Sequence, residues 1–494
     1  MTGLNINEVP TGLFIDGSFV DASDGGTIPT FNPATGRVIA EVAAGTEQDV
    51  DRAVASSRAA FESGGWSRID PAERKAILQR FARKIEDHAE QLATLDSMEA
   101  GKPISDCVEG DLPEVIGLFS WYAEAIDKVF GKVSPTGAGH LGLIVTEPIG
   151  VVAAVVPWNF PLPVLAMKLA PALAAGNAVV VKPPEQAALS ALYLARLAVE
   201  AGIPAGILNV VPGHGHVAGK ALGLHDDVDA LTFTGSTEVG RRFLEYSAKS
   251  NFKAVTLEMG GKSPQIVTEH VAHMLPQVAE DLANAAFWNS GQNCTAGSRI
   301  LVHNSIKDRF VEELKAVAER KIVGDTASPE TELGPIIEEA ALERMLDAVA
   351  RAREGGAQVV TGGERILEET GGWFIAPTVL TGVTNADPIA QTELFGPITV
   401  VMGYDTEDEA IRLANETEYG LAATVWSKDI DQAIRLSRRI KAGIVAVNGF
   451  SEGDFTTPFG GYRASGFGGK EKGLEAFGQY TETKTIWVSL DPGA

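Results

Sequence analysis

The fold is decided from residue 150 onward, where the chain reads Gly150-Val151-Val152-Ala153-Ala154-Val155-Val156-Pro157-Trp158-Asn159-Phe160-Pro161. A short, continuous apolar run of this kind is typical of a strand that is buried on both faces. Similar runs follow, separated by segments with helical periodicity such as 187–201 and 238–248. Apolar strands that alternate with helices predict a parallel sheet with helices on both sides. The further runs are Ala178–Val181, Ile207–Val211, Ala230–Phe233 and Val255–Leu257.

A second set of strands follows Gly260-Gly261, so we expect two α/β lobes. Two segments, 125–148 and 470–494, fit neither lobe, and Thr485–Val488 within the second predicts an exposed strand. Before residue 150, Asp16-Gly17 predicts a hairpin turn, and Asp70-Pro71 predicts the start of a helix that ends at Gly101. The strands of the second set are Ile266-Val267, Ile300–Val302, Ile398–Val401, Ala422–Trp426 and Ile444–Val447.

Composition limits the classes of function. The 494 residues contain 41 Lys and Arg against 65 Asp and Glu, which gives a formal net charge of −24. So acidic a chain is a poor partner for nucleic acid, because binding a phosphate backbone needs a basic face. Two cysteines, Cys107 and Cys294, rule out a disulfide framework. With no signal peptide and no apolar run of membrane-spanning length, we expect a cytoplasmic protein without a membrane anchor.

Three motifs at successive strand ends favour a nucleotide-binding crevice. The segment Gly213–Gly219 is a glycine-rich turn, one residue longer than the usual dinucleotide fingerprint and without the expected acid after it. Small residues in Phe233–Ser236 allow backbone N–H groups to approach a phosphate at a helix start. An acid and a base in Lys182–Glu185 lie where a ribose is expected.

Cys294 and Glu258 are the candidate nucleophile and base. Glycine and polar residues surround Cys294, whereas Asp106 and Glu109 beside Cys107 would raise the pKa of that thiol and make it the poorer nucleophile. The alternative for Cys294 is a small buried hydrophobe. Glu258 ends an apolar strand, where partial desolvation suits a general base, and its alternative is a strand-end salt bridge.

Together these segments resemble the aldehyde dehydrogenase superfamily, whose motifs they match in family order over most of the chain. The resemblance implies a variant Rossmann NAD-binding domain (1–124 and 149–259), an α/β catalytic domain (260–469) and a small β oligomerisation element (125–148 and 470–494). It also implies a homodimer or homotetramer. The matching pieces are Pro157–Pro161, Lys182–Glu185, Phe233–Ser236, Glu258–Gly261, Gly291–Cys294, Glu393–Pro397 and Pro458–Tyr462.

The resemblance also implies a mechanism. Cys294, as thiolate, attacks the aldehyde carbon. The Asn159 side-chain amide and the Cys294 backbone N–H hold the oxyanion, and loss of one such donor typically slows the reaction about 100- to 1000-fold. Hydride transfer to the nicotinamide leaves a thioester, which Glu258 hydrolyses by activating water. Lys168 matches a lysine assigned to proton relay. The matching relay residue Glu471 is placed only by assuming a one-residue insertion within 466–468, which puts that role in doubt.

NAD is the cofactor that the resemblance implies. Lys182 and Glu185 match the pair that binds the adenosine ribose, and a carboxylate there would repel a 2′-phosphate, which favours NAD over NADP. Ser236 is expected to contact the pyrophosphate and Glu393 the nicotinamide ribose. No metal site is expected. The full set of expected cofactor residues is Trp158, Lys182, Glu185, Gly215, Gly219, Phe233, Gly235, Ser236, Glu393 and Phe395.

The aldehyde itself is less well defined. The stretches 121–129, 452–457 and 480–487 resemble those of γ-glutamyl-γ-aminobutyraldehyde and ω-aminoaldehyde dehydrogenases. Asp106, Glu109, Asp111 and Asp454 would place negative charge at the substrate entrance, where an ammonium is welcome; the alternative is an ordinary acidic surface. Met167 stands where succinate-semialdehyde enzymes carry Arg, which argues against a substrate with a carboxylate. The expected pocket is lined by Trp121, Phe160, Met167, Asp454 and Phe459.

Several alternatives remain open at this stage. An aromatic or aliphatic aldehyde fits an apolar tunnel equally well. A catalytically silent binding protein of the same family would have no chemical need of Cys294, Glu258 and Asn159 together. A CoA-acylating enzyme is disfavoured by Glu258, because water activation would compete with the thiol acceptor.

Overall fold

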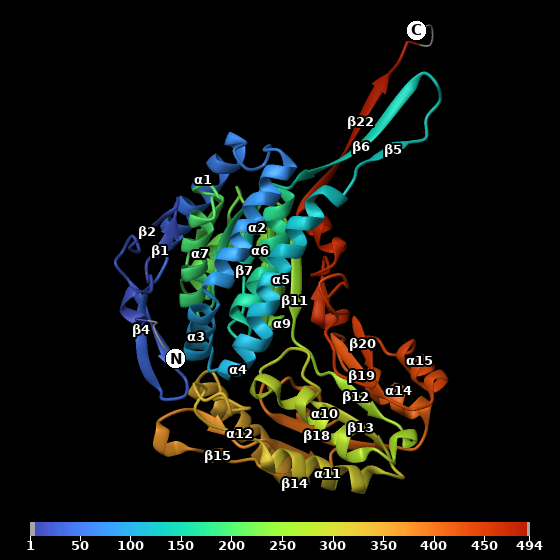
Figure 1. Cartoon of the computed structure of the whole chain (residues 1–494). Helices are drawn as coiled ribbons and strands as arrows, with labels where there is room; N and C mark the ends of the chain where they lie inside the picture. Colours follow the sequence, from blue (N-terminus) through green and yellow to red (C-terminus); the bar gives the residue numbers. More distant parts are fainter. Residues whose placement is uncertain (1–4, 492–494) are drawn as a thin grey trace.

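Two large sheets, each covered by helices, make up most of the chain in this computed structural model, which describes residues 5–491 (Figure 1). The expected hairpin at Asp16-Gly17 is present, and both turn residues have positive φ (54° and 76°). In spatial order the first sheet contains β2 (Ser18–Val20), β1 (Leu13–Ile15), β9 (Leu208–Val210), β8 (Ala178–Lys182), β7 (Val151–Val155), β10 (Ala230–Gly235), β11 (Ala254–Met259) and β21 (Gly466–Phe467).

The strand order reverses beside β7. The chain adds β8 and then β9 on one side of β7, and returns to place β10 and β11 on the other. Val152 of β7 therefore pairs with Val179 of β8 and with Ala230 of β10, both in parallel. In open α/β sheets such a reversal leaves a crevice at the carboxyl ends of the strands, which is where ligands bind.

Helices cover both faces of this sheet because its central strand is apolar on both sides. Val152 and Ala154 face one hydrophobic core, whereas Val151, Ala153 and Val155 face another, as the two-residue period of a strand requires. The helices of the first core are α2 (Pro71–Asp87), α3 (Ala89–Ala100), α5 (Leu112–Ala125), α6 (Pro161–Ala175) and α7 (Leu189–Glu200), and those of the second are α1 (Glu47–Ser63), α8 (Lys220–Leu224) and α9 (Thr237–Lys249).

The single helix expected between Asp70 and Gly101 is in fact two helices. Asp70 caps the amide of Ala72 as predicted, but the helix that starts at Pro71 ends at Asp87, and a new one starts at Ala89. His88 between them has φ −114° and ψ 19°, which is outside the helical region. The apolar periodicity continues across the break, because Ile85 and Leu92 are both fully buried, so the sequence pattern alone does not reveal it.

The second sheet carries the expected later strands. It is parallel apart from the β14 edge, and helices again cover both faces. One short strand of this region, β21, leaves the second sheet and pairs with β11 of the first. In spatial order the strands of the second sheet are β14 (Gln358–Thr361), β17 (Thr378–Thr381), β18 (Ile398–Tyr404), β13 (Arg299–His303), β12 (Pro264–Val267), β19 (Ala422–Trp426) and β20 (Ile444–Val447).

The helices of the second sheet also form two groups. One face carries α10 and α11, and the other carries α12, α13, α14 and α15. Two small hairpins, β3–β4 and β15–β16, stand outside both sheets. The elements are α10 (Leu275–Phe287), α11 (Lys307–Arg320), α12 (Glu339–Glu354), α13 (Pro388–Gln391), α14 (Glu407–Asn415), α15 (Ile430–Ser437), β3 (Thr27–Asn32), β4 (Arg37–Ala43), β15 (Arg365–Ile366) and β16 (Phe374–Ile375).

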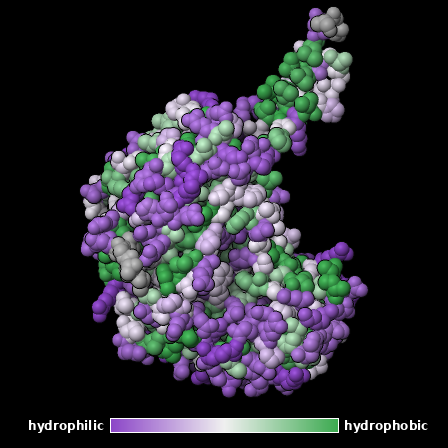
Figure 2. All heavy atoms as spheres, viewed as in Figure 1, coloured by the Kyte–Doolittle hydropathy of each residue, from purple (hydrophilic) through white to green (hydrophobic). Residues whose placement is uncertain are grey.

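A three-stranded sheet projects from the body of the molecule (Figure 1). It joins β5 (Lys132–Ser134), β6 (His140–Pro148) and β22 (Thr481–Ser489), so the expected strand 485–488 pairs with the other outlying segment. Figure 2 shows apolar atoms over much of this arm, and Phe130 (79% exposed) and Trp487 (57%) contribute to them. Exposed apolar area of this kind marks an interaction surface. Within residues 5–491, no helix has the length and apolarity needed to cross a membrane.

Arg299 ties the second sheet to its surrounding loops. Its fully buried guanidinium donates to the backbone carbonyls of Lys262 (2.9 Å), Leu413 (3.1 Å) and Ala414 (3.0 Å) and to Oδ1 of Asn385 (2.9 Å). One side chain therefore donates to four buried acceptors, of which the Leu413 carbonyl also accepts from Nδ2 of Asn385 (3.4 Å).

Arg299→Met is expected to lower the free energy of unfolding by about 3–5 kcal/mol, because it leaves several buried carbonyls unsatisfied. Urea unfolding followed by circular dichroism measures the loss. Arg438→Met is the control, since Arg438 is exposed and its change should stay within about 0.5 kcal/mol. Equal stability of the two variants would contradict this role.

Candidate active site

The crevice at the carboxyl ends of the first sheet gathers most of the residues singled out by sequence. Asn159 follows β7, Lys182 ends β8, Ser236 follows β10 and Glu258 lies within β11. These strands are neighbours in the sheet, so the side chains at their ends are brought together although they are far apart in sequence. The second sheet contributes the segment that ends at Cys294.

The segment that carries Cys294 has an unusual backbone. After the helix α10, the turn Trp288–Gly291 places Asn289, Ser290 and Gly291 at φ 51°, 55° and 66°. A Cβ on Gly291 would lie 2.1 Å from the carbonyl oxygen of Gly396, so only glycine fits there. Left-handed residues in succession are strained, and such strain is found mainly at functional sites.

Asn159 is tied to this turn and keeps one donor free. Its Nδ2 donates to the backbone carbonyl of Gln292 (2.9 Å), while Nδ2 of Asn289 donates to the Asn159 carbonyl (2.9 Å). An amide nitrogen carries two hydrogens, so the second remains for an oxygen in the crevice. The backbone N–H of Cys294 acts to lower the pKa of its own thiol. The two N–H groups belong to segments that the hydrogen bond from Asn159 to Gln292 joins, and an oxyanion hole needs two such donors.

Glu258 is buried close to the turn 460–461. The backbone N–H of Gly461 donates to Oε2 of Glu258 (3.1 Å), and a Cβ on Gly460 would lie 2.2 Å from Oε1. Burial raises the pKa of Glu258 well above its usual range, and the nearby negative charge of Glu471 adds to the rise. A carboxyl group with a raised pKa is suited to exchange protons with water at neutral pH.

Lys168 and Glu471 form a buried ion pair. Nζ of Lys168 lies 2.7 Å from Oε1 of Glu471 and donates to Oγ1 of Thr232 (3.0 Å). The other carboxylate oxygen of Glu471 is buried without a hydrogen-bond partner. The structure thus brings Glu471 to the site, although the sequence left its alignment in doubt.

The thiol of Cys294 lines one narrow cavity together with Glu258. Phe160, Met167 and Phe459, three of the expected pocket residues, line the same cavity. Burial raises the pKa of the Cys294 thiol well above its usual range, and the carboxylates of Glu452, Glu393 and Glu258 raise it further. The thiol is therefore neutral until a base or a nearby cation stabilises the thiolate.

Two acidic side chains of this cavity were missed by the sequence analysis. Glu452 accepts hydrogen bonds from the hydroxyl of Thr295 and from Nδ2 of Asn293 (3.4 Å). Glu114 forms an ion pair with Lys472 (2.7 Å). Both carboxylates line the cavity that holds the thiol. Glu452 opens the segment 452–457, which carried the aminoaldehyde-like resemblance, whereas Glu114 lies outside the resembling stretches and had no such signal.

Three of the four acidic residues expected at the entrance lie elsewhere, and Asp106 is the exception. Asp111 is buried in an ion pair with Lys102, Glu109 is exposed, and Asp454 is exposed and accepts hydrogen bonds within its own turn from Thr456. Neither Asp454 nor Trp121 is among the residues that line the cavity with the thiol; the ring of Trp121 packs on that of Tyr122.

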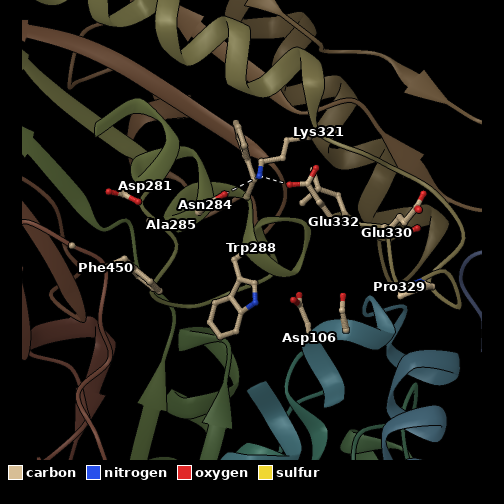
Figure 3. A pocket seen from close by; sticks show the side chains of 15 residues that line it. Asp106, Asp281, Asn284, Ala285, Trp288, Lys321, Pro329, Glu330, Glu332 and Phe450 are labelled. Carbon is tan, nitrogen blue, oxygen red and sulfur yellow. Dashed lines mark hydrogen bonds and ion pairs between the residues drawn. The ribbon is translucent and has the colours of Figure 1, made fainter. Parts of the chain in front are cut away.

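An outer pocket of about 560 Å³ adjoins this cavity. Trp288 lines both, and its indole nitrogen points toward Asp106 (Figure 3). Burial raises the pKa of Asp106 to about 6. On the opposite wall Lys321 donates to Asn284 (2.8 Å) and to Glu332 (2.6 Å). Trp288, which the sequence analysis did not select, separates the two spaces.

Lys182 and Glu185 fit the ribose of a dinucleotide. Lys182 is 5% exposed, and burial lowers the pKa of its ammonium to about 8. Within residues 5–491 no acceptor hydrogen-bonds that ammonium, so a ligand hydroxyl would satisfy it. Glu185 accepts from the Gly215 N–H (2.6 Å) and lies 3.1 Å from Nδ1 of His214. Although burial acts to raise its pKa, these hydrogen bonds lower it, so Glu185 is ionised.

The start of α9 fits a pyrophosphate. Ser236 caps this helix through the amide of Val239 (3.3 Å), and the helix start is rich in free N–H groups. Gly235 lies directly beneath the ring of Phe233, which belongs to the core. A Cβ on Gly219 would lie 4.0 Å from the side chain of Lys182.

Glu393 and the aromatic pair Trp158–Phe395 lie on the side of the crevice formed by the second sheet. Oε1 of Glu393 accepts from the Gly261 N–H (2.9 Å), and burial raises its pKa to about 7. A Cβ on Gly260 would lie 1.9 Å from the other oxygen of this carboxylate. The rings of Trp158 and Phe395 meet edge to face at 5.4 Å. These groups complete a crevice whose donors and acceptors match a dinucleotide.

Comparison with known proteins agrees with this geometry. The model of the aldehyde dehydrogenase family matches residues 19–486. Aminoacetaldehyde dehydrogenase of Pseudomonas aeruginosa is 48% identical over 97% of this chain and 96% of its own length. The NADP/NAD-dependent aldehyde dehydrogenase PuuC of Escherichia coli is 44% identical over 97% of this chain and 96% of its own. A solved indole-3-acetaldehyde dehydrogenase in complex with NAD⁺ superposes with a TM-score of 0.96 at 47% identity, covering 98% of this chain and 97% of that one.

Lys182→Met is expected to weaken binding of NAD⁺ about 10- to 100-fold, because a charged hydrogen bond contributes about 1.5–3 kcal/mol. Binding by the unaltered protein should weaken from about pH 8 upward, since the ammonium loses its proton there, whereas the variant should lack this dependence. Isothermal titration calorimetry between pH 6.5 and 9.5 measures both. Lys220→Met is the control, because Lys220 is exposed; an unchanged dissociation constant for Lys182→Met would refute the assignment.

Proposed function

The chain belongs to the aldehyde dehydrogenase family, and on that premise we propose that it oxidises an aldehyde to a carboxylic acid with Cys294 as the nucleophile. One observation carries the proposal. The half-buried thiol shares a cavity with Glu258, and the Asn159 amide, which is hydrogen-bonded to the Gln292 carbonyl, keeps a second hydrogen free. A silent family member would not need this combination.

In the first half of the reaction, the thiolate of Cys294 attacks the carbonyl carbon and forms a C–S bond. The carbonyl electron pair moves to oxygen, where the Asn159 amide and the Cys294 N–H hold it. NAD⁺, held by residues such as Lys182 and Glu393, would supply the acceptor for the hydride. Re-formation of the C=O bond with loss of the hydride would leave Cys294 as a thioester.

In the second half, Glu258 takes a proton from water, and the water oxygen attacks the thioester carbon. The C–S bond breaks, the acid leaves, and sulfur departs as thiolate. The raised pKa of Glu258 suits this role, because a carboxylate that holds its proton tightly is a stronger base. We assign Lys168 and Glu471 to the route by which that proton reaches solvent, since they form one buried pair whose negative charge acts on Glu258.

NAD is the proposed cofactor, rather than NADP. The ionised carboxylate of Glu185, held by Gly215 beside Lys182, would repel a 2′-phosphate on the adenosine ribose. We assign the binding of NAD to Lys182, Ser236, Glu393 and the other expected cofactor residues, because the crevice they form fits a dinucleotide. The relative named for both cofactors makes a direct comparison of NAD⁺ and NADP⁺ the natural check.

An ω-aminoaldehyde is the proposed substrate class. In the part of the chain that the structure describes, no lysine or arginine forms an ion pair with Glu452, whereas Glu114 is paired with Lys472. Burial raises the pKa of Glu452, although the charge of Lys472 acts to lower it. A substrate ammonium beside this carboxyl would stabilise its ionised form. Two relatives have names that point to aminoaldehyde or general aldehyde oxidation. An aromatic aldehyde is the second candidate, supported by the rings of Phe160 and Trp288 and by the relative named for indole-3-acetaldehyde.

The proposed division of the chain keeps an NAD-binding domain (1–124 and 149–259), a catalytic domain (260–469) and an oligomerisation element (125–148 and 470–494). The two large sheets and the projecting arm support these bounds, with β21 returning to the first sheet. The exposed apolar residues of the arm support assembly into a homodimer or homotetramer.

Cys294→Ala is expected to abolish aldehyde oxidation, because no other half-buried thiol is present among the described residues. Glu258→Gln should retain acylation and accumulate the thioester, visible by intact mass spectrometry as an adduct that Cys294→Ala lacks. NADH formation followed at 340 nm measures turnover. Aldehyde oxidation by Cys294→Ala, or normal steady-state turnover by Glu258→Gln, would contradict the roles assigned.

Glu452→Gln is expected to lower kcat/KM for 4-aminobutanal about tenfold, which corresponds to about 1.4 kcal/mol of lost attraction. Hexanal, benzaldehyde and succinate semialdehyde complete the panel, and the ratio of 4-aminobutanal to hexanal cancels any effect on the thiol itself. Glu109→Gln is the matched control, because Glu109 is exposed. A ratio that Glu452→Gln leaves unchanged would favour an aromatic or aliphatic substrate.

A further inference from the structure

Lys102 is a fully buried lysine that the mechanism above does not use. It follows the carboxyl end of α3, and its Nζ lies 2.5 Å from Oδ2 of Asp111. Burial acts to lower the pKa of this ammonium, but the charges of Asp111, Cys107 and Asp106 and the hydrogen bond to Asp111 together outweigh burial, and the pKa is raised. Lys102 therefore keeps its charge inside the protein.

Two aromatic rings of the thiol cavity face this charge. Nζ of Lys102 lies 3.7 Å from the ring centroid of Phe160 and 5.8 Å from that of Trp288. The two rings are 5.1 Å apart, and both line the cavity with Cys294. A cation within about 6 Å of a ring face is attracted to it, and more strongly where water is excluded.

The two rings that contact Lys102 lie next to the residues that supply the oxyanion donors. Phe160 directly follows Asn159, which carries the free amide donor, and Trp288 opens the strained turn that leads to Cys294. The first ring belongs to the first sheet's crevice and the second to a segment of the other half of the chain. One ammonium therefore holds together the two segments that supply the two oxyanion donors.

We propose that Lys102 is a positioning residue, which fixes the separation between the Asn159 amide and the Cys294 backbone N–H through the rings of Phe160 and Trp288. The inference rests on the proposed oxyanion role of those two donors. Asp106, from the same segment as Asp111, lies on the side of Trp288 toward which the indole nitrogen points (Figure 3). The segment 102–111 thus places the Lys102 ammonium near the ring of Trp288 and the Asp106 carboxyl near its polar edge.

The experiment is a double-mutant cycle of Lys102→Met and Phe160→Leu, read out as the rate constant of the first NADH turnover at saturating aldehyde and NAD⁺. Lys102→Met should lower this rate constant about 10- to 100-fold, which is the loss typical of misplaced reacting groups. In the Phe160→Leu background the same change should lower it less than about threefold, because the ring on which the ammonium acts is gone. Lys102→Arg, which keeps the charge, should recover most of the rate.

Lys253→Met is the matched control. Lys253 is similarly buried in the same half of the chain, where its ammonium donates to the Gly223 carbonyl and to Ser250 (both 2.8 Å) rather than to the cavity. It should lower the melting temperature and leave the first-turnover rate constant unchanged. Should Lys102→Met yield no folded protein, Asp111→Asn takes its place, since it releases the ammonium from its anchor and must slow the same step.

The outcomes separate the two proposals. Two results together support the inference. Cys294→Ala abolishes the first turnover seen in the unaltered protein, and Lys102→Met or its replacement slows that turnover only when the Phe160 ring is present. A normal rate constant in the lysine variant, or equal losses with and without the Phe160 ring, overturns it and leaves the proposed function intact. No thiol-dependent turnover in the unaltered protein overturns both.

Discussion

Burial of charged groups where the two large sheets meet is the constraint on which the site depends. Glu258, Lys168 with Glu471, and Lys102 with Asp111 are all removed from water there. A buried charge is tolerated only when it is paired or hydrogen-bonded, and removing one partner of a buried pair is strongly destabilising. Each of these groups is therefore held in one place. Lys102 in turn contacts the rings of Phe160 and Trp288, in the segments that lead to Asn159 and Cys294.

The architecture was largely predictable from the sequence because the central strands of both sheets are parallel and buried on both faces. Strands such as Val151–Val155 then become continuous apolar runs that stand out from the helical periodicity around them. The break between α2 and α3 was not predictable, because it depends on the conformation of a single residue, His88, and interrupts no apolar pattern. The return of β21 to the first sheet was equally hidden, since two residues carry no periodicity.

The site divides in the same way. Residues at strand ends, such as Lys182 and Glu258, were predictable because parallel strands carry their carboxyl ends to one edge. Glu452 and Lys102 were not, because their roles come from contacts made across the fold, with Thr295 and with Phe160. The sequence suggested an acidic entrance, but which acids face the cavity depends on pairing: Lys102 neutralises Asp111, whereas no cation forms an ion pair with Glu452 among the described residues.

The two cysteines show how far local charge can carry such an argument. Acidic neighbours were the reason to set Cys107 aside, yet burial and nearby carboxylates raise the pKa of both thiols well above the usual range. The pKa therefore does not distinguish the two thiols, but their access to a ligand does. Cys107 is fully buried, whereas Cys294 is half-buried and lines a cavity together with Glu258. A thiol that carboxylates keep neutral is protected from oxidation until a cation in the crevice offsets their charge. On this reasoning the carboxylates that make Cys294 a poor thiolate in isolation are also those that tie its reactivity to a bound ligand.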